Sequence, residues 1–171
     1  MTPTSKLEFN RIQQQFQLNA GILEEEKKLC KHIFFISAFS KWLNEEESNQ
    51  AIVPYSYFSE MSPSQIKEFF VYENKLINFF KVLYQQTEIF AGCYETETEE
   101  YYYFETLESF LSFIKIYIRR ETGAFIIIPK LWLIIEFNFD FTYKVYEFKK
   151  CKSFIEIVQQ AGLFILQQTN D

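Results

Sequence analysis

A long stretch of alternating apolar and polar residues constrains this chain more than any other feature. Every odd-numbered position from Leu131 to Val145 is apolar, and the even positions include Glu136. A period of two is the spacing of side chains on one face of a β-strand, and it does not fit a helix. These residues would span about 50 Å if fully extended, whereas a compact domain of this length is about 40 Å across. We therefore expect the strand to bend or break at Asn138–Asp140.

Shorter β-prone runs lie on both sides of this stretch. Thr87–Tyr94 and Glu99–Phe104 predict a hairpin, joined by a loop at Glu95–Thr98. Phe125–Ile128 is typical of a buried strand, and Leu163–Leu166 predicts a terminal strand after Gly162. The second half of the chain should therefore contain a largely antiparallel sheet.

The first half of the chain has helical periodicity. The spacing of its apolar residues predicts a long helix over residues 22–43, with one stripe made of Ile22, Leu29, Ile33, Ile36 and Leu43. A second long helix should begin at Ser62, where Pro63 suits the first helical position and Gln65 completes a capping box. A short helix over residues 5–18 would place Phe9, Ile12 and Phe16 on one face.

Two further helices are expected in the second half. Thr106 is a typical N-cap residue, so a helix should begin after it. Its inner face should consist of Leu107, Phe110, Leu111, Ile114 and Ile118. The helix should end at Gly123, with Arg119 and Arg120 in its last turn. Ser153–Ala161 predicts a shorter helix. The expected fold class is α+β: two long N-terminal helices packed on a mainly antiparallel sheet of four to six strands with two further helices. We expect a single domain over residues 1–171, with a helical layer at 1–86 and the sheet with two helices at 87–171.

Composition limits the chemistry that the chain can perform. It is 48% apolar and 20% aromatic, which excludes a disordered protein, but it has one histidine and four well-separated glycines. Its three cysteines, Cys30, Cys93 and Cys151, have neither metal-binding nor redox spacing. We therefore expect no metal, no cofactor and no enzymatic activity. No apolar run approaches the ~18 residues of a membrane helix, and the start of the sequence lacks the apolar stretch of a secretory signal. The expected location is cytoplasmic, without a membrane partner.

Charge is concentrated in one short segment. Residues 88–108 contain seven glutamates and no lysine or arginine, while residues 1–87 carry a net charge of −1 and residues 109–171 a net charge of +2. The net charge of −6 therefore comes from this segment. One interpretation is a solvated hairpin edge that repels edge-to-edge pairing. The other is an acidic recognition surface for a basic protein, in which tyrosines supply the contact area.

The recognition hypothesis names eight partner-binding residues. They are the glutamates and two of the tyrosines of the predicted hairpin and of the following helix: Glu95, Glu97, Glu99, Glu100, Tyr101, Tyr103, Glu105 and Glu108. An acidic surface argues against nucleic acid as a direct ligand, because phosphate binding needs a basic face.

The second half resembles a known class of proteins. Six segments follow one another over residues 87–168. They are the hairpin, Thr106-Leu-Glu-Ser-Phe-Leu-Ser-Phe-Ile-Lys-Ile-Tyr-Ile118, Phe125-Ile-Ile-Ile-Pro-Lys-Leu-Trp-Leu-Ile-Ile-Glu136, Asp140-Phe-Thr-Tyr143, a short helix and Ala161-Gly-Leu-Phe-Ile-Leu166. This order resembles the small α+β immunity proteins of bacterial polymorphic-toxin and contact-dependent inhibition systems. The resemblance implies a non-catalytic cytosolic antitoxin that binds and blocks a cognate toxin domain. It transfers no catalytic or interface residue by position.

Three hypotheses follow. The first is an immunity protein whose acidic surface neutralises a basic toxin, such as a nuclease. The second is a non-catalytic adaptor or regulatory domain that binds another protein. The third is an enzyme that uses His32, Glu136 and Asp140, and it requires one cleft that unites these side chains. The oligomeric state is open in all three.

Overall fold

The computed structural model has an α+β fold, as the sequence predicts. It describes residues 2–3, 11–12, 14–15, 29–51, 55–93, 101–119, 123–138 and 140–167. The strands are β1 Thr2–Pro3, β2 His32–Ser37, β3 Phe90–Cys93, β4 Tyr101–Tyr103, β5 Ala124–Ile128, β6 Leu133–Glu136, β7 Thr142–Glu147 and β8 Phe164–Gln167. The helices are α3 Glu45–Ala51, α4 Pro63–Gln86, α5 Leu107–Ile118 and α6 Lys152–Gln160, with 3-10 turns η1 Tyr55–Glu60 and η2 Pro129–Leu131.

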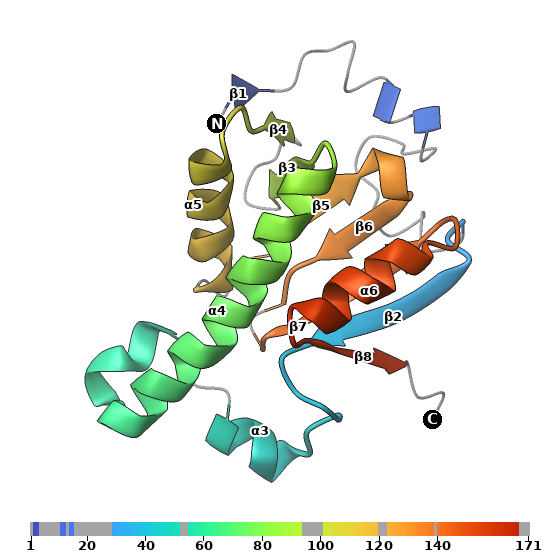
Figure 1. The fold of residues 1–171 in the computed structure, drawn as a ribbon. Helices are drawn as coiled ribbons and strands as arrows, with labels where there is room; N and C mark the ends of the chain where they lie inside the picture. The colour runs from blue at the N-terminus through green and yellow to red at the C-terminus, as the bar shows by residue number, and fades with distance from the viewer. Residues whose placement is uncertain are drawn as a thin grey trace.

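The strands form one antiparallel sheet that is larger than expected. Its order is β1-β4-β3-β5-β6-β7-β2-β8, so it has seven strands and the two-residue bridge β1. Helices α4, α5 and α6 lie on the same side of this sheet (Figure 1). The predicted range of four to six strands was too small, because the first half of the chain contributes β2 and β1.

The expected helix over residues 22–43 is wrong in its described part. His32–Ser37 is strand β2, which pairs with β7 on one side and with β8 on the other. Both faces of β2 contact apolar groups, since Phe34 and Ile36 pack on the helix side and Ile33 packs on the opposite side. A strand covered on both faces has consecutive apolar residues, and such a run also satisfies a helical stripe. The helical layer expected over residues 1–86 therefore contains a strand of the sheet, and α4 is the one long helix in its described part.

The alternating stretch breaks where its length requires. It forms η2, β6 and β7, and the break between the two strands contains Asn138 and Asp140. Phe141 takes a left-handed backbone conformation with φ 56°. The Asp140 carboxylate accepts a hydrogen bond of 3.0 Å from the backbone N–H of Thr142 at the start of β7. This local bond compensates for ladder bonds that the break removes.

The helix starts predicted at Ser62 and Thr106 are confirmed. Ser62 accepts from the backbone N–H of Gln65, and the Gln65 side chain accepts from the N–H of Ser62, which completes the capping box of α4. Thr106 caps α5 in the same way, by accepting from the N–H of Ser109. Helix α6 is followed by Gly162 at φ +71°, a conformation that favours glycine.

The predicted inner face of α5 is largely confirmed, and its predicted end is not. Phe110, Ile114 and Ile118 are fully buried, while Leu107 and Leu111 are half-buried against the core. The last helical residue is Ile118, five positions before Gly123. Arg119 is the C-cap, and Arg120 lies outside the described residues.

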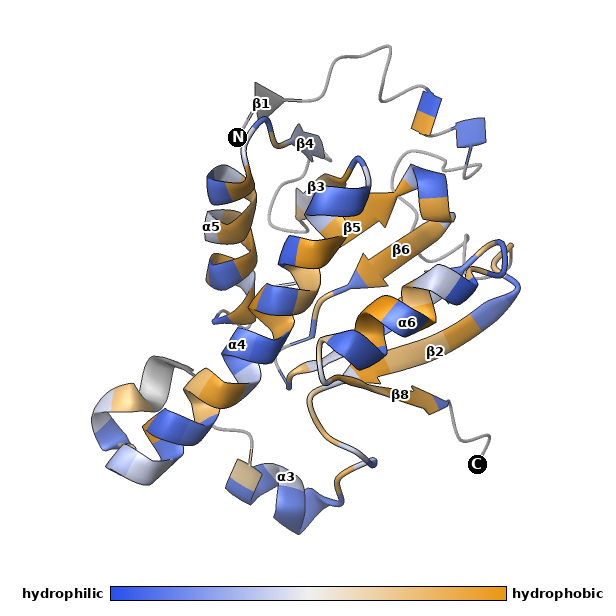
Figure 2. Ribbon diagram, viewed as in Figure 1, coloured by the Kyte–Doolittle hydropathy of each residue, from blue (hydrophilic) through white to orange (hydrophobic). Residues whose placement is uncertain are grey.

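Alternation along the strands divides the sheet into two apolar faces. The helix-side face carries Ile126 and Ile135, which pack against the three helices. The opposite face, called here the second face, carries a smaller cluster of Ile12, Phe90, Phe125, Ile127, Ile134 and Tyr146. Figure 2 shows β5 and most of β6 apolar, as strands covered on both faces should be, and β6 ends at Glu136. Residues 11–12 and 14–15 are helical, and the rest of the helix expected over residues 5–18 lies outside the described residues.

Candidate functional site

Strand β4 is one of the described parts of the expected recognition surface. Tyr101–Tyr103 pair with β3 on one side, and Tyr102 and Tyr103 pair with β1 on the other. β4 is therefore the last strand before the two-residue bridge at this margin of the sheet. Three successive tyrosines are well suited to this position. Tyrosine has high β propensity, and its hydroxyl group can remain in water while the ring packs.

The tyrosines belong partly to the core and partly to the surface. Tyr101 and Tyr103 lie on the second face, where Tyr101 contacts the ring of Phe125 at 5.8 Å and Tyr103 contacts that of Phe90 at 5.7 Å between centroids. Tyr102 points to the opposite side and packs on the helix-side core. All three are half-buried. Tyr101 and Tyr103 are thus aromatic groups fixed by packing, with part of each surface accessible.

Gly92 makes the position of Tyr101 possible. It lies on β3 directly opposite Tyr101 on one side and Phe125 on the other. A Cβ atom at Gly92 would overlap the ring of Phe125. Because Gly92 has no side chain, the Phe125 ring can extend across β3 toward Tyr101.

A buried residue, Phe104, lies in the connection between β4 and α5. Its carbonyl oxygen accepts a hydrogen bond of 2.9 Å from the hydroxyl of Tyr84 on α4. Burial, with a smaller contribution from Tyr103, raises the pKa of Tyr84, which favours the neutral hydroxyl that donates this bond. The contact fixes the end of β4 on helix α4.

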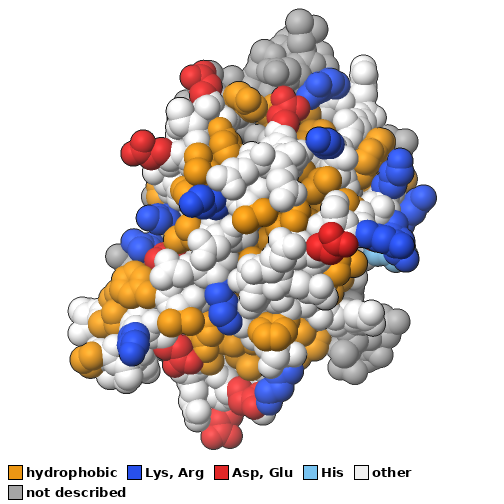
Figure 3. Space-filling view, in the orientation of Figure 1, with side chains coloured by type: hydrophobic (Ala, Val, Ile, Leu, Met, Phe, Trp, Pro, Cys, Tyr) orange, Lys and Arg blue, Asp and Glu red, His pale blue; other side chains and the backbone are white. Residues whose placement is uncertain are grey.

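Two glutamates flank the N-cap of α5. Glu105 precedes Thr106, and Glu108 lies in the first helical turn; both side chains are exposed. A carboxylate in the first turn is favoured by the positive end of the helix dipole, by about 0.3–1 kcal/mol. Figure 3 shows acidic side chains over the start of α5. The β4–α5 connection therefore brings Tyr103, Glu105 and Glu108 to one margin of the molecule.

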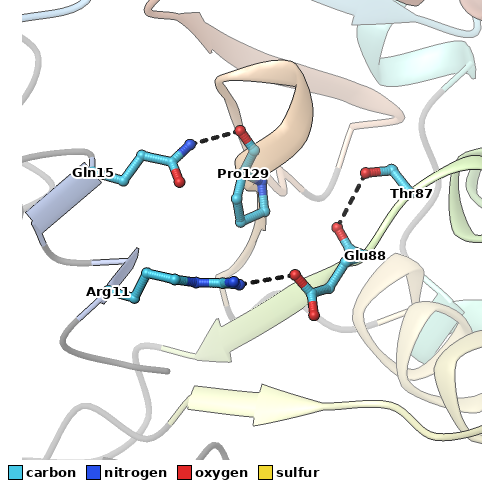
Figure 4. Close-up of polar contacts among 5 residues, drawn as sticks. All are labelled: Arg11, Gln15, Thr87, Glu88 and Pro129. Atoms are coloured by element: carbon cyan, nitrogen blue, oxygen red, sulfur yellow. Dashed lines mark hydrogen bonds and ion pairs between the residues drawn. The ribbon is translucent and has the colours of Figure 1, made fainter. Parts of the chain in front are cut away.

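One glutamate of the acidic segment is paired with a cation from far along the chain. The Arg11 guanidinium contacts the Glu88 carboxylate at 2.9 Å, and nearby Gln15 donates to the carbonyl of Pro129 at 2.6 Å (Figure 4). Both charged side chains are more than one-third exposed, so the pair adds little stability, about 0–1 kcal/mol. Its main effect is to offset one of the seven negative charges. Sequence reasoning missed this contact because nothing local links residues 77 positions apart.

The predicted site residues therefore divide into two groups. The structure places Tyr101, Tyr103, Glu105 and Glu108 along β4 and the start of α5. Glu95, Glu97, Glu99 and Glu100 lie outside the described residues. The name tyrosine–glutamate surface is used below for these eight residues.

The carboxylates and the histidine of the enzyme hypothesis are not brought together. His32 pairs with Glu147 at the far end of β7 from Asp140, roughly 20 Å along the strand. Glu136 pairs with Lys144 and accepts a hydrogen bond of 2.6 Å from the Tyr146 hydroxyl on the second face. Burial raises the pKa of Asp140, and its backbone hydrogen bonds oppose that rise. These three residues therefore form no common cleft.

Comparisons with known proteins do not assign the chain to a family. Neither models of known protein families, nor curated proteins, nor solved structures gave a match to the chain. Within the described ranges, no group of three or more His, Cys, Asp or Glu side chains could hold a metal ion. The helices of the same ranges include none that is both long and apolar enough to cross a membrane.

Proposed function

We propose that this chain is an immunity protein that binds a cognate toxin domain through the tyrosine–glutamate surface and neutralises it. The observation that carries the proposal is the combination of surplus anions with half-exposed aromatic rings at one sheet margin. Tyr101 and Tyr103 are fixed by Phe125 and Phe90, and exposed Glu105 and Glu108 follow on the same connection. Aromatic groups held in place lose little side-chain entropy on binding, which favours their use as contact residues.

The charge favours a basic toxin, such as a nuclease. An enzyme that cuts nucleic acid presents cations to phosphates, and a surface rich in carboxylates can occupy the same cations. Clustered charge also accelerates encounter by about 10–10³-fold at low ionic strength. Fast encounter benefits an inhibitor that must act before its target does damage. In this proposal, the protein acts as a non-catalytic, cytoplasmic inhibitor that uses no cofactor.

The test uses the toxin domain encoded directly upstream of this gene. The purified chain should bind that domain in a pull-down and suppress its activity when the two are mixed in equal amounts. Co-expression should protect cells that otherwise die from the toxin domain. Failure both to bind and to protect would end the proposal. Binding to a different, non-toxic protein with no protection would favour the adaptor hypothesis instead.

A triple charge reversal tests the surface separately from the function. Glu97→Lys, Glu99→Lys and Glu100→Lys together should slow association with the toxin and flatten its salt dependence, because they reverse a steering field. If the triple variant associates at the rate of the unmodified protein, the toxin binds elsewhere on the molecule.

A further inference from the structure

A groove lies at the opposite margin of the sheet from β4. It has a volume of about 640 Å³ and lies where β2 begins, β8 ends and α6 passes over both strands. Phe34, Ile155 and Ile165 supply apolar walls, and each of them is only half-buried. Lys31, His32 and Lys150 also line it, and all three are exposed.

The charge around this groove is opposite to that of the whole chain. Exposed Lys149 and Lys152 flank Lys150, and Figure 3 shows Lys and Arg side chains gathered at this side together with the histidine. Glu147 also lines the groove, but it is buried, and its carboxylate accepts a hydrogen bond of 2.9 Å from the backbone N–H of Cys151. Exposed Glu156 lies one helical turn after Lys152. Four lysines against these two carboxylates leave the margin positive.

The first residues of β2 border this groove. The ladder between β2 and β8 runs from the Phe34–Gln167 pair to the Ser37–Phe164 pair. His32 and Ile33 precede that ladder, line the groove and pair with β7. An extended segment in the groove can place alternate side chains against its apolar walls.

We propose that this groove binds an extended acidic segment of a partner protein. Carboxylates of the segment contact Lys31 and Lys150, while its alternating apolar side chains lie against Phe34, Ile155 and Ile165. The lysines favour an acidic occupant, because opposite charges attract. The apolar walls favour a peptide over a nucleic acid, and the net charge of −6 on the whole chain would also repel the phosphates of a nucleic acid. This inference does not depend on the toxin proposal, because the groove and the tyrosine–glutamate surface share no residue.

The experiment measures fluorescence anisotropy with the full chain and a labelled peptide of alternating glutamate and valine. We expect saturable binding that weakens as salt is added. The Lys31→Glu/Lys150→Glu variant should bind at least about tenfold more weakly. A matched variant, Lys67→Glu/Lys115→Glu, reverses two exposed lysines elsewhere and should stay within about twofold of the unmodified chain. Ile155→Ser should also weaken binding without changing the salt dependence.

Several results would overturn the inference. One is the absence of saturable binding to the folded, unmodified chain. Another is equal weakening in the two double variants, which would show attraction to lysines in general. Equal binding of a control peptide of alternating glutamine and valine would remove the role of charge. Tighter binding of a single-stranded oligothymidylate than of the acidic peptide would assign the groove to nucleic acid. Circular dichroism establishes that each variant is folded.

Discussion

Gly92 shows how the absence of one side chain fixes the geometry of the candidate site. The Phe125 ring occupies the space that a Cβ at this position would need, and Tyr101 packs on that ring. A glycine inside a strand weakens the strand, since it adds backbone entropy and contributes no packing. Its presence here is explained by the ring that crosses over it.

Replacing this glycine gives the first prediction. Gly92→Ala should lower the free energy of unfolding by about 1–3 kcal/mol, because the new methyl group overlaps a packed ring. Urea unfolding measures the change. Gly92→Ala/Phe125→Leu should be less destabilised than the sum of the two single changes, since the smaller side chain makes room for the methyl group. Simple addition of the two effects would contradict the proposed steric cause.

Burial makes the charged form of the Asp140 carboxyl group less favourable in the folded protein. It raises the pKa of this group above the ordinary value of 3.8. A raised folded pKa gives stability that is present below the ordinary pKa and is lost as pH rises through the folded pKa. The carboxylate nevertheless stabilises the break between β6 and β7, because it accepts a hydrogen bond from the backbone N–H of Thr142.

Asp140→Asn separates the charge from the hydrogen bond. The amide oxygen can accept the same bond, so the variant should be more stable than the unmodified protein at pH 7. The difference should shrink as pH falls through the raised pKa and should vanish below about pH 3.8. Thermal unfolding across this range measures it. A variant with lower stability than the unmodified protein at pH 7 would contradict the account, and Asp140→Ala, which loses the acceptor, provides the comparison.

At the scale of elements, one ion pair joins two helices. The Arg119 guanidinium, at the C-cap of α5, donates two hydrogen bonds of 2.5 and 3.0 Å to the Glu73 carboxylate of α4. Glu73 is 3% exposed and Arg119 is 29% exposed. The pair joins the C-terminal end of α5 to α4.

Removing one member of this pair should be costly. Arg119→Met leaves a buried carboxylate without its counterion, and we expect a loss of about 3–5 kcal/mol in the free energy of unfolding. Glu73→Met/Arg119→Met should regain most of that loss, because no buried charge remains. Lys41→Met, which removes the exposed Lys41–Glu47 ion pair, is the control and should leave stability nearly unchanged. Equal losses in the Arg119 and Lys41 variants would contradict this interpretation.

Local sequence signals predicted the elements whose cause is local. The capping box at Ser62 and Gln65 and the N-cap at Thr106 each depend on residues within a few positions, and both are present. The break near Asp140 was predicted differently, from the length of the alternating stretch relative to the size of the domain, and it is also present. Strand β2 was not predicted, because its identity depends on β7 and β8, which lie more than 100 positions away in the sequence. A run of apolar residues such as Ile33–Ile36 fits either element until its neighbours are known.

At the scale of the whole molecule, the two margins of the sheet differ in charge. The β4–α5 margin carries exposed Glu105 and Glu108, and the margin at the start of β2 carries Lys31 and Lys150. The identities of the glutamates and tyrosines at the first margin could be read from the sequence. The packing of Tyr101 on Phe125 and the pairing of Arg11 with Glu88 could not, since both depend on distant segments.

The most direct test of the central proposal is the association rate of this protein with the toxin domain, measured by stopped-flow at low and high salt. Glu105→Lys/Glu108→Lys should slow association by about tenfold or more at low salt and flatten the salt dependence. Glu60→Lys/Glu156→Lys changes the net charge equally at other exposed positions and should have a much smaller effect. Equal slowing by both variants, or unchanged association for the first, would contradict recognition through the tyrosine–glutamate surface.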